Sequence, residues 1–193
     1  MIVIAALLAG YWPLAQLPSP DGLATDIWVR GHNFIASVDR ALLGNHLYVK
    51  GPEGYDPEGI LGTLPAIAQG LIGIAIGEML IRRERAATRP LLTAGRARLA
   101  LGGVWGLVFP VVKDIWSSSF VLVTSGITVL SLALLHHWLD REGRKPGVAA
   151  TAMLAFGANA IAAYTLHQIT AGVVTWDLLL LPFRALREAL GVP

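Results

Sequence analysis

The stretch Thr63–Ile81, TLPAIAQGLIGIAIGEMLI, contains a single charged residue, Glu78, and is long enough to enter a lipid bilayer. A polar loop, Asn33–Gly62, ends directly against it with the block Tyr55-Asp56-Pro57-Glu58-Gly59-Ile60-Leu61-Gly62. Charged side chains are costly near the hydrocarbon of a membrane. Paired carboxylates at such a boundary are therefore a candidate functional site.

The composition indicates an integral membrane protein. Hydrophobic residues make up 54% of the chain and charged residues only 15%, with a mean hydropathy of +0.59; a soluble domain has about a quarter charged residues. The formal net charge of +2 is too small to indicate nucleic-acid binding, and cysteine is absent, which excludes disulfide and thiolate chemistry. No zinc-ligand spacing or phosphate-binding loop is present, so we expect no metal site.

Apolar segments recur along the whole chain and predict an all-α fold, a polytopic transmembrane helix bundle formed as a single membrane domain over residues 1–193. We expect about five spanning helices, since a span needs about 20 apolar residues. A sixth segment, about 171–183, is interrupted by Asp177 and Pro182, and we expect it to be interfacial or re-entrant. The five predicted helices cover about residues 1–14, 63–81, 99–112, 120–138 and 148–166.

Basic residues are unevenly distributed between the predicted loops. The loop 82–98 is rich in arginine, whereas in the loop 15–62 acidic residues outnumber Arg30, Arg40 and Lys50. Loops rich in lysine and arginine stay in the cytoplasm. We therefore predict a cytoplasmic loop 82–98 and an outer, non-cytoplasmic loop 15–62.

Small residues recur along the second predicted helix, where Gly62, Ala66 and Gly70 are four apart and Gly73 and Gly77 follow. Such spacing lets helix backbones approach closely in lipid. We interpret this face as a helix-packing surface.

Three polar clusters fall on the predicted outer side. Each contains side chains able to bind a polar substrate, and the third contains the candidate catalytic pair, Asn159 and His167, which lie eight apart on nearly one helix face. The first cluster comprises Asp39, Arg40, His46, Tyr48, Asp56 and Glu58; the second comprises Lys113, Asp114, Trp116, Ser117, Ser118 and Ser119; the third comprises Asn159, Tyr164 and His167.

Structural interpretations of the same residues stay open. Asp56 before Pro57 is typical of a helix N-cap, and Asp39 beside Arg40 of a local ion pair. Lys113 and Trp116 suit membrane-interface anchors. His167 is equally well explained as a buried histidine bonded to a neighbouring helix.

Several blocks resemble the heparan-α-glucosaminide N-acetyltransferase family of transmembrane acyltransferases, in its carboxy-terminal portion. The resemblance lies in order and spacing across most of the chain. The matching blocks are Val38-Asp39-Arg40-Ala41-Leu42-Leu43-Gly44 with His46-Leu47-Tyr48, Tyr55 to Thr63, Pro110 to Ser119, and Asn159-Ala160-Ile161 with Tyr164 and His167.

The resemblance implies an enzyme that transfers an acetyl group from cytoplasmic acetyl-CoA, its donor substrate, to an amino sugar across the membrane. Cytoplasmic arginines, with Arg82, Arg83 and Arg85 as candidates, would attract the CoA phosphates. The outer carboxylates would hold the acceptor sugar, and His167 or Asn159 would serve as base or oxyanion donor.

Two departures from the family lead us to expect a truncated or degenerate relative that is not independently catalytic. The family's catalytic histidine lies in a region before the matched blocks, and Val112 stands where the family usually has Asn. The alternative is an accessory structural subunit of a larger membrane complex, binding partner helices and lipid.

Overall fold

The computed structural model describes residues 1–141, 147–173, 181–182 and 185. All its named elements are helices, and they fall into two compact units, Met1–Gly143 and Arg144–Pro193. The expectation of one membrane domain over 1–193 stays a prediction. Most of the predicted sixth segment, 171–183, lies outside the described residues.

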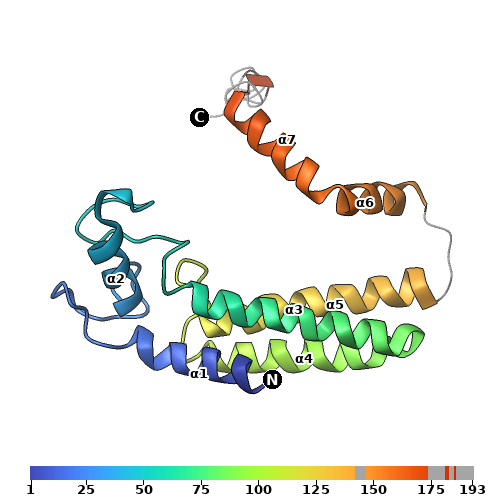
Figure 1. The fold of residues 1–193 in the computed structure, drawn as a ribbon, viewed down its shortest axis with the longest axis horizontal. Helices are drawn as coiled ribbons and strands as arrows, with labels where there is room; N and C mark the ends of the chain where they lie inside the picture. Colours follow the sequence, from blue (N-terminus) through green and yellow to red (C-terminus); the bar gives the residue numbers. More distant parts are fainter. Residues whose placement is uncertain (142–146, 174–180, 183–184, 186–193) are drawn as a thin grey trace. The chain divides into compact units, whose positions relative to one another are not determined.

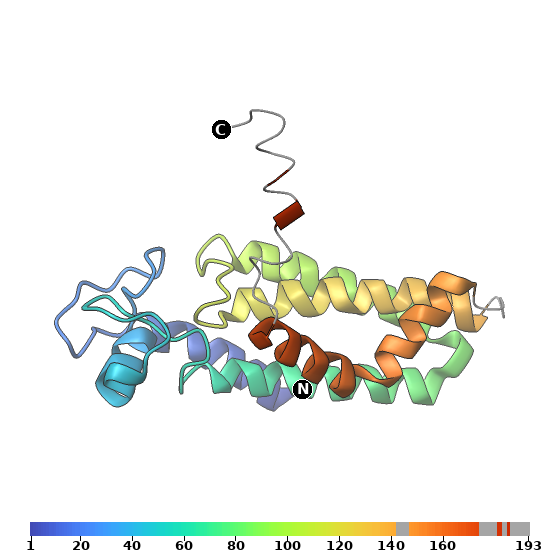
Figure 2. The ribbon, with the colours of Figure 1, turned by 90° about the horizontal axis from the view of Figure 1, so that it is seen from above.

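The first unit is built on long helices that run side by side (Figures 1 and 2). Its helices are α1 (Ile2–Ala15), α2 (Phe34–Leu43), α3 (Thr63–Arg83), α4 (Thr88–Trp105) and α5 (Ser118–Leu135), with short turns η1 (Gly44–His46), η2 (Glu84–Ala86) and the π-helical η3 (His136–Arg141). The predicted helices 1–14, 63–81 and 120–138 are confirmed to within a few residues.

In the described part of the chain, two helices are long and apolar enough to cross a membrane, Thr63–Arg83 and Ser118–Trp138, and α1 is a shorter apolar helix. Both carry large apolar side chains on their outer faces, for example Ile74, 61% exposed, and Ile127, 52% exposed. Water would solvate such surfaces poorly. Lipid or another helix would cover them.

The predicted helix 99–112 and the loop 82–98 are wrong in their bounds, because α4 covers Thr88–Trp105. The buried positions Thr88, Leu91, Gly95 and Gly102 recur three, four and seven residues apart on the face toward α5, so packing extends the helix through the arginines. It ends before Pro110, which lacks an N–H and restricts the residue before it.

Close packing of α4 against α5 depends on glycine. A Cβ on Gly102 would lie 2.8 Å from the Val123 nitrogen, and one on Gly126 would lie 2.8 Å from the Leu99 nitrogen. The glycines that the sequence singled out on α3 behave differently: at Gly70, Gly73 and Gly77 a Cβ would meet nothing within 4 Å. The α3 face is thus open in the described structure, and the close helix contact is between α4 and α5.

The second unit contains α6 (Val148–Ala158) and α7 (Ala160–Val173) in place of the single predicted helix 148–166. The helix is interrupted at Asn159, whose side-chain nitrogen donates a hydrogen bond to the Ala155 carbonyl at 2.8 Å. Asparagine competes for helix carbonyls in this way and disfavours helix interiors.

Candidate functional site

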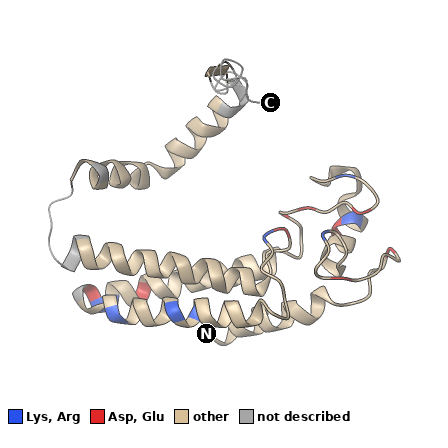
Figure 3. Ribbon diagram, turned by 180° about the vertical axis from the view of Figure 1, so that it is seen from behind, with Lys and Arg blue, Asp and Glu red and all other residues tan. Residues whose placement is uncertain are grey.

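Residues 16–62 and 106–117 form a polar cap at one end of the long helices, while Arg82 and Arg83 lie at the far end of α3. Figure 3 shows charged residues in the cap and around the α3–α4 turn. Among the long helices between these two regions, α4 also carries charged residues. The predicted separation of acidic and arginine-rich regions is therefore present along the helices. It leaves the side of the membrane unassigned.

Helix α2 organises the cap, and it replaces what we predicted as loop. The Asn33 side chain accepts from the Ala36 N–H at 2.9 Å, and Gly44 ends the helix at a φ of 50°. Its apolar face buries Ile35 in a small core with Tyr11 and Phe109. The N-cap and C-cap residues were the signals for this helix.

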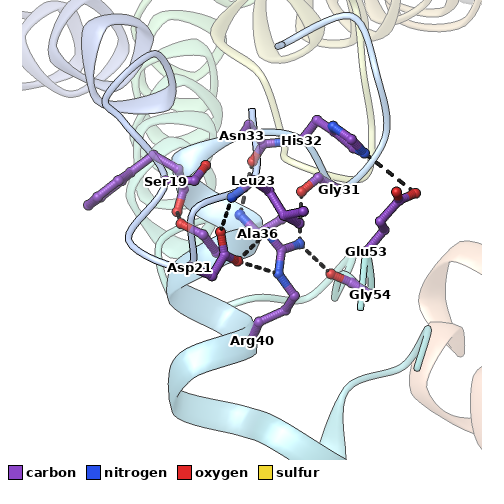
Figure 4. Close-up of polar contacts among 12 residues, drawn as sticks. Ser19, Asp21, Leu23, Gly31, His32, Asn33, Ala36, Arg40, Glu53 and Gly54 are labelled. Carbon is purple, nitrogen blue, oxygen red and sulfur yellow. Dashed lines mark hydrogen bonds and ion pairs between the residues drawn. The ribbon is translucent and has the colours of Figure 1, made fainter. Parts of the chain in front are cut away.

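Arg40 joins three parts of the cap (Figure 4). Its Nη1 donates to the carbonyls of Gly31 and Gly54, both at 2.8 Å, and its Nε and Nη2 reach Asp21 Oδ2 at 2.7 and 2.6 Å. Only 9% of the Arg40 side chain is exposed. Desolvation alone would raise the pKa of Asp21, but hydrogen bonds from Arg40 and from the Leu23 N–H outweigh it and the pKa is lowered. The Arg40 side chain therefore stabilises the cap by joining its three segments.

Asp39 faces a different partner from its neighbour, so the predicted local Asp39–Arg40 ion pair is not formed. Asp39 is 1% exposed and its Oδ1 accepts from the Ile60 N–H at 2.9 Å. Gly59 lies so close that a Cβ there would clash with the carboxylate. Burial raises the pKa of Asp39, with the charge of Asp56 adding to the effect. Asp39 thus positions the segment that directly follows Glu58.

Asp56 closes the loop that carries Glu58 and does not cap α3, which begins at Thr63. Its Oδ1 accepts from the Glu58 N–H at 2.9 Å, and its Oδ2 accepts from the Tyr48 N–H at 3.1 Å. The N-cap interpretation is wrong, because these two bonds form a side-chain turn instead.

Glu58 is exposed and lines a pocket of about 270 Å³ with Trp116, Thr63 and the small residues Gly59, Gly62 and Ala66. Trp116 has a positive φ of 51°, and its indole nitrogen donates to the Gln69 side chain at 2.8 Å. Its ring also meets Phe120 edge-on, with centroids 5.4 Å apart. These contacts hold the indole as one wall of the pocket, and a carboxylate and a hydroxyl lie on the others.

Lys113 lines a second pocket, of about 240 Å³, together with Arg30, Asp114, Tyr55 and Asn33. Arg30 pairs with Asp114 at 2.9 Å and reaches the Tyr55 hydroxyl at 3.4 Å. Glu58 and Lys113 therefore line separate pockets of the cap. The sequence placed Asp114 in the second polar cluster, but it offered no signal for its pairing with Arg30, which joins distant loops.

Ser118 makes a structural contact between helices. Its hydroxyl donates to the Leu8 carbonyl of α1 at 2.7 Å and is fully buried. The preceding Ser117 caps α5 by accepting from the Phe120 N–H at 3.3 Å, and it donates to the Pro110 carbonyl at 2.7 Å. These serines tie the cap segment 106–117 to the helices.

The remaining candidates lie apart from both pockets. His46 is exposed in η1. Arg82 and Arg83 are exposed at the end of α3, where Arg82 reaches Glu78 at 3.3 Å, and the side chain of Arg85 lies outside the described residues. Asn159 and His167 are exposed in the second unit, in different elements. Within the described part of the chain, no group of three metal-ligating side chains gathers.

The described residues define a helical protein, in which two helices are candidates to cross a membrane and a polar cap with pockets lies at one end of the first unit. No family model matches the chain. It is 30% identical to the heparan-alpha-glucosaminide N-acetyltransferase of Mus musculus over 68% of its length, and equally to that of Homo sapiens. The aligned region spans 22% of each relative. The chain is a distant, partial relative of the heparan-alpha-glucosaminide N-acetyltransferases.

Proposed function

We propose that this chain provides the acceptor-binding part of a membrane N-acetyltransferase and that it does not transfer acetyl groups alone. The pocket of Glu58 and Trp116 supports the first part. A carboxylate suits the ammonium of an amino sugar, the indole suits the apolar face of a sugar ring, and Thr63 can bond a hydroxyl. Of the described residues, one carboxylate and no histidine line the pocket, which suits binding more than proton transfer.

Membrane placement is part of the same proposal. The chain would cross the bilayer with α3 and α5, helped by α1 and α4 and by the α6–α7 region, as about five spans. The cap would face the non-cytoplasmic side. Arg82, Arg83 and Arg85 at the other end would then meet cytoplasmic acetyl-CoA, the donor that the family uses.

Calorimetric titration of the purified chain in detergent tests the acceptor site. Glucosamine is expected to bind at least about tenfold more tightly than glucose, since a charge-assisted hydrogen bond contributes about 1.5–3 kcal/mol. Glu58→Gln should remove this preference. The matched control Glu78→Gln, exposed on α3, should leave it.

Equal binding of glucosamine to the Glu58→Gln variant and to the unaltered chain would overturn the acceptor site. Acetyl transfer from acetyl-CoA to glucosamine by the purified chain would overturn the second part. Orientation is checked separately: because cysteine is absent, Lys50→Cys and Arg83→Cys report which end an impermeant maleimide reaches.

An accessory role in a larger membrane complex is the second candidate, and the open face of α3 favours it. Gly70 and Gly73 are exposed and would accept the backbone of another helix or a lipid chain. Gly70→Leu should then release a co-purifying subunit in mild detergent without changing glucosamine binding. Retention of that subunit by the variant would count against this role.

A further inference from the structure

A groove of about 420 Å³ runs between α1 and α4 in the first unit. Its floor includes Ile72 of α3 and Leu122 of α5, and its rims carry the small residues Ala5 and Ala9 on α1 and Ala94 and Ala97 on α4. Ala5, Ala9 and Ala97 are exposed. Rims of alanine let a neighbouring helix approach closely.

Among the residues that the structure describes, Arg98 is the only charged side chain in the lining of this groove. It is half-buried, its Nη1 donates to the Ala94 carbonyl of its own helix at 3.0 Å, and no ion pair of the described residues includes it. Trp105 lines the same groove, and among described residues its buried indole nitrogen has no hydrogen-bond partner. Arginine and tryptophan side chains only donate, and the one acceptor that the described residues give this pair is the Ala94 carbonyl.

The depth of Arg98 distinguishes the acceptors that can reach it. Arg98 lies between Gly95 and Gly102 on α4. Gly95 lies against Gly126 and Leu130 of α5, and Gly102 lies against Leu122 and Val123. Gly126 also lies against the Leu99 nitrogen, directly after Arg98, and Gly126 is near the middle of the candidate span Ser118–Trp138. Lipid phosphates lie at the bilayer surface, about 15 Å from its centre. A carboxylate on a neighbouring helix can lie at mid-span, and paired charges there usually satisfy one another.

We propose that the α1–α4 groove receives a membrane-spanning helix of another polypeptide that carries an aspartate or glutamate at the level of Arg98. The carboxylate accepts from the guanidinium, and the alanine rims admit the backbone of that helix. This surface requires the membrane placement of α3 and α5, and it is independent of sugar binding in the cap.

Energy transfer in phosphatidylcholine vesicles tests the surface. The donor dye is attached at Lys50→Cys, an exposed cap position in a chain without other cysteines. The probes are three matched synthetic leucine–alanine helices of membrane-spanning length, with a central Glu, Gln or Leu and a terminal acceptor dye. The Glu helix is expected to bind at least about tenfold more tightly than the Leu helix.

Variants locate the effect. Arg98→Met should abolish the preference for Glu, whereas Arg96→Met, exposed on the same helix and outside the groove lining, should leave it unchanged. Ala97→Leu keeps the guanidinium but fills the rim, and it should weaken the Glu helix at least about tenfold, which tests the surface even if Arg98→Met fails to fold.

Three results would overturn the proposal. The Glu helix binds no better than the Leu or Gln helix; Ala97→Leu binds the Glu helix as tightly as the unaltered chain does; or replacing phosphatidylcholine by phosphatidylglycerol abolishes the preference, which would assign Arg98 to lipid headgroups.

Discussion

The cap and the long helices of the first unit are stabilised by different means. In the cap, a few directed polar contacts join segments that are distant in sequence: Arg40 alone reaches Asp21, Gly31 and Gly54. In the helices, stability depends on how closely backbones approach, as at Gly102 and Gly126. The comparison teaches that one side chain can organise the cap, whereas the bundle depends on the absence of side chains at particular positions.

The largest expected effect is at Arg40, whose replacement should destabilise the cap and leave the long helices stable. Arg40→Met should destabilise the cap by about 3–5 kcal/mol, because it removes the charged partner of Asp21 and the donor to two carbonyls. Amide hydrogen exchange should accelerate in residues 19–56 and stay slow in α4 and α5. Arg30→Met is the control: Arg30 is 73% exposed in its pair with Asp114, and its loss should cost under about 1 kcal/mol. Uniform acceleration across both regions would contradict the distinction.

Adjacent glycines on α4 give the next effect. Gly102→Ala should destabilise the helices by about 1–3 kcal/mol, since its Cβ would lie 2.8 Å from backbone of α5. Gly103→Ala meets nothing within 4 Å and should stabilise by up to about 1 kcal/mol through helix propensity. Thermal unfolding in detergent compares the two variants, and a lower Tm for Gly103→Ala than for Gly102→Ala would refute the packing argument.

Ser118 lies where the cap meets the helices, and its loss should have a smaller effect. Ser118→Ala removes the bond to the Leu8 carbonyl and should cost about 1 kcal/mol. Ser131→Ala is the control, because Ser131 is exposed and bonds only to the Ile127 carbonyl of its own helix. Denaturant unfolding with a probe on α1 measures both, and we expect the control to match the unaltered chain.

The smallest effect is a pH dependence of opposite sign at two cap carboxylates. The raised pKa of Asp39 means that the free energy of unfolding falls as pH rises from the ordinary aspartate pKa through the raised one. Because the pKa of Asp21 is lowered, the free energy of unfolding falls as pH drops below the ordinary aspartate pKa. Asp39→Asn should flatten the first slope and Asp21→Asn the second. Unfolding titrations across acidic pH give both slopes, and unchanged slopes would contradict these shifts.

Helix prediction succeeded where hydrophobic runs coincide with elements, at α1, α3 and α5. It failed where packing or local capping competes with hydropathy. Helix α4 extends through Arg89, Arg96 and Arg98 because its opposite face packs against α5, and α2 lies in a polar stretch whose Asn33 and Gly44 caps are short signals. The break at Asn159 arises from a side-chain bond that no hydropathy average detects.

The candidate site was predicted in part. Glu58 and Trp116, which the sequence analysis placed in two different clusters, line one pocket, and Lys113 lines a different one. Asp39, Arg40, Asp56 and Ser118 were chosen as substrate-binding residues, and the structure engages each of them in contacts that shape the cap. Residue type indicates which groups can bind; it does not reveal whether the fold already uses them.

Composition and hydropathy alone establish that this chain is helical and suited to lipid, because the free energy of transferring apolar side chains depends on residue type more than on neighbours. Tertiary structure alone shows which cap side chains are free, which glycines lie against backbone and that Arg98 lines a groove. Those properties come from distances between residues far apart in sequence, which only the folded chain brings together.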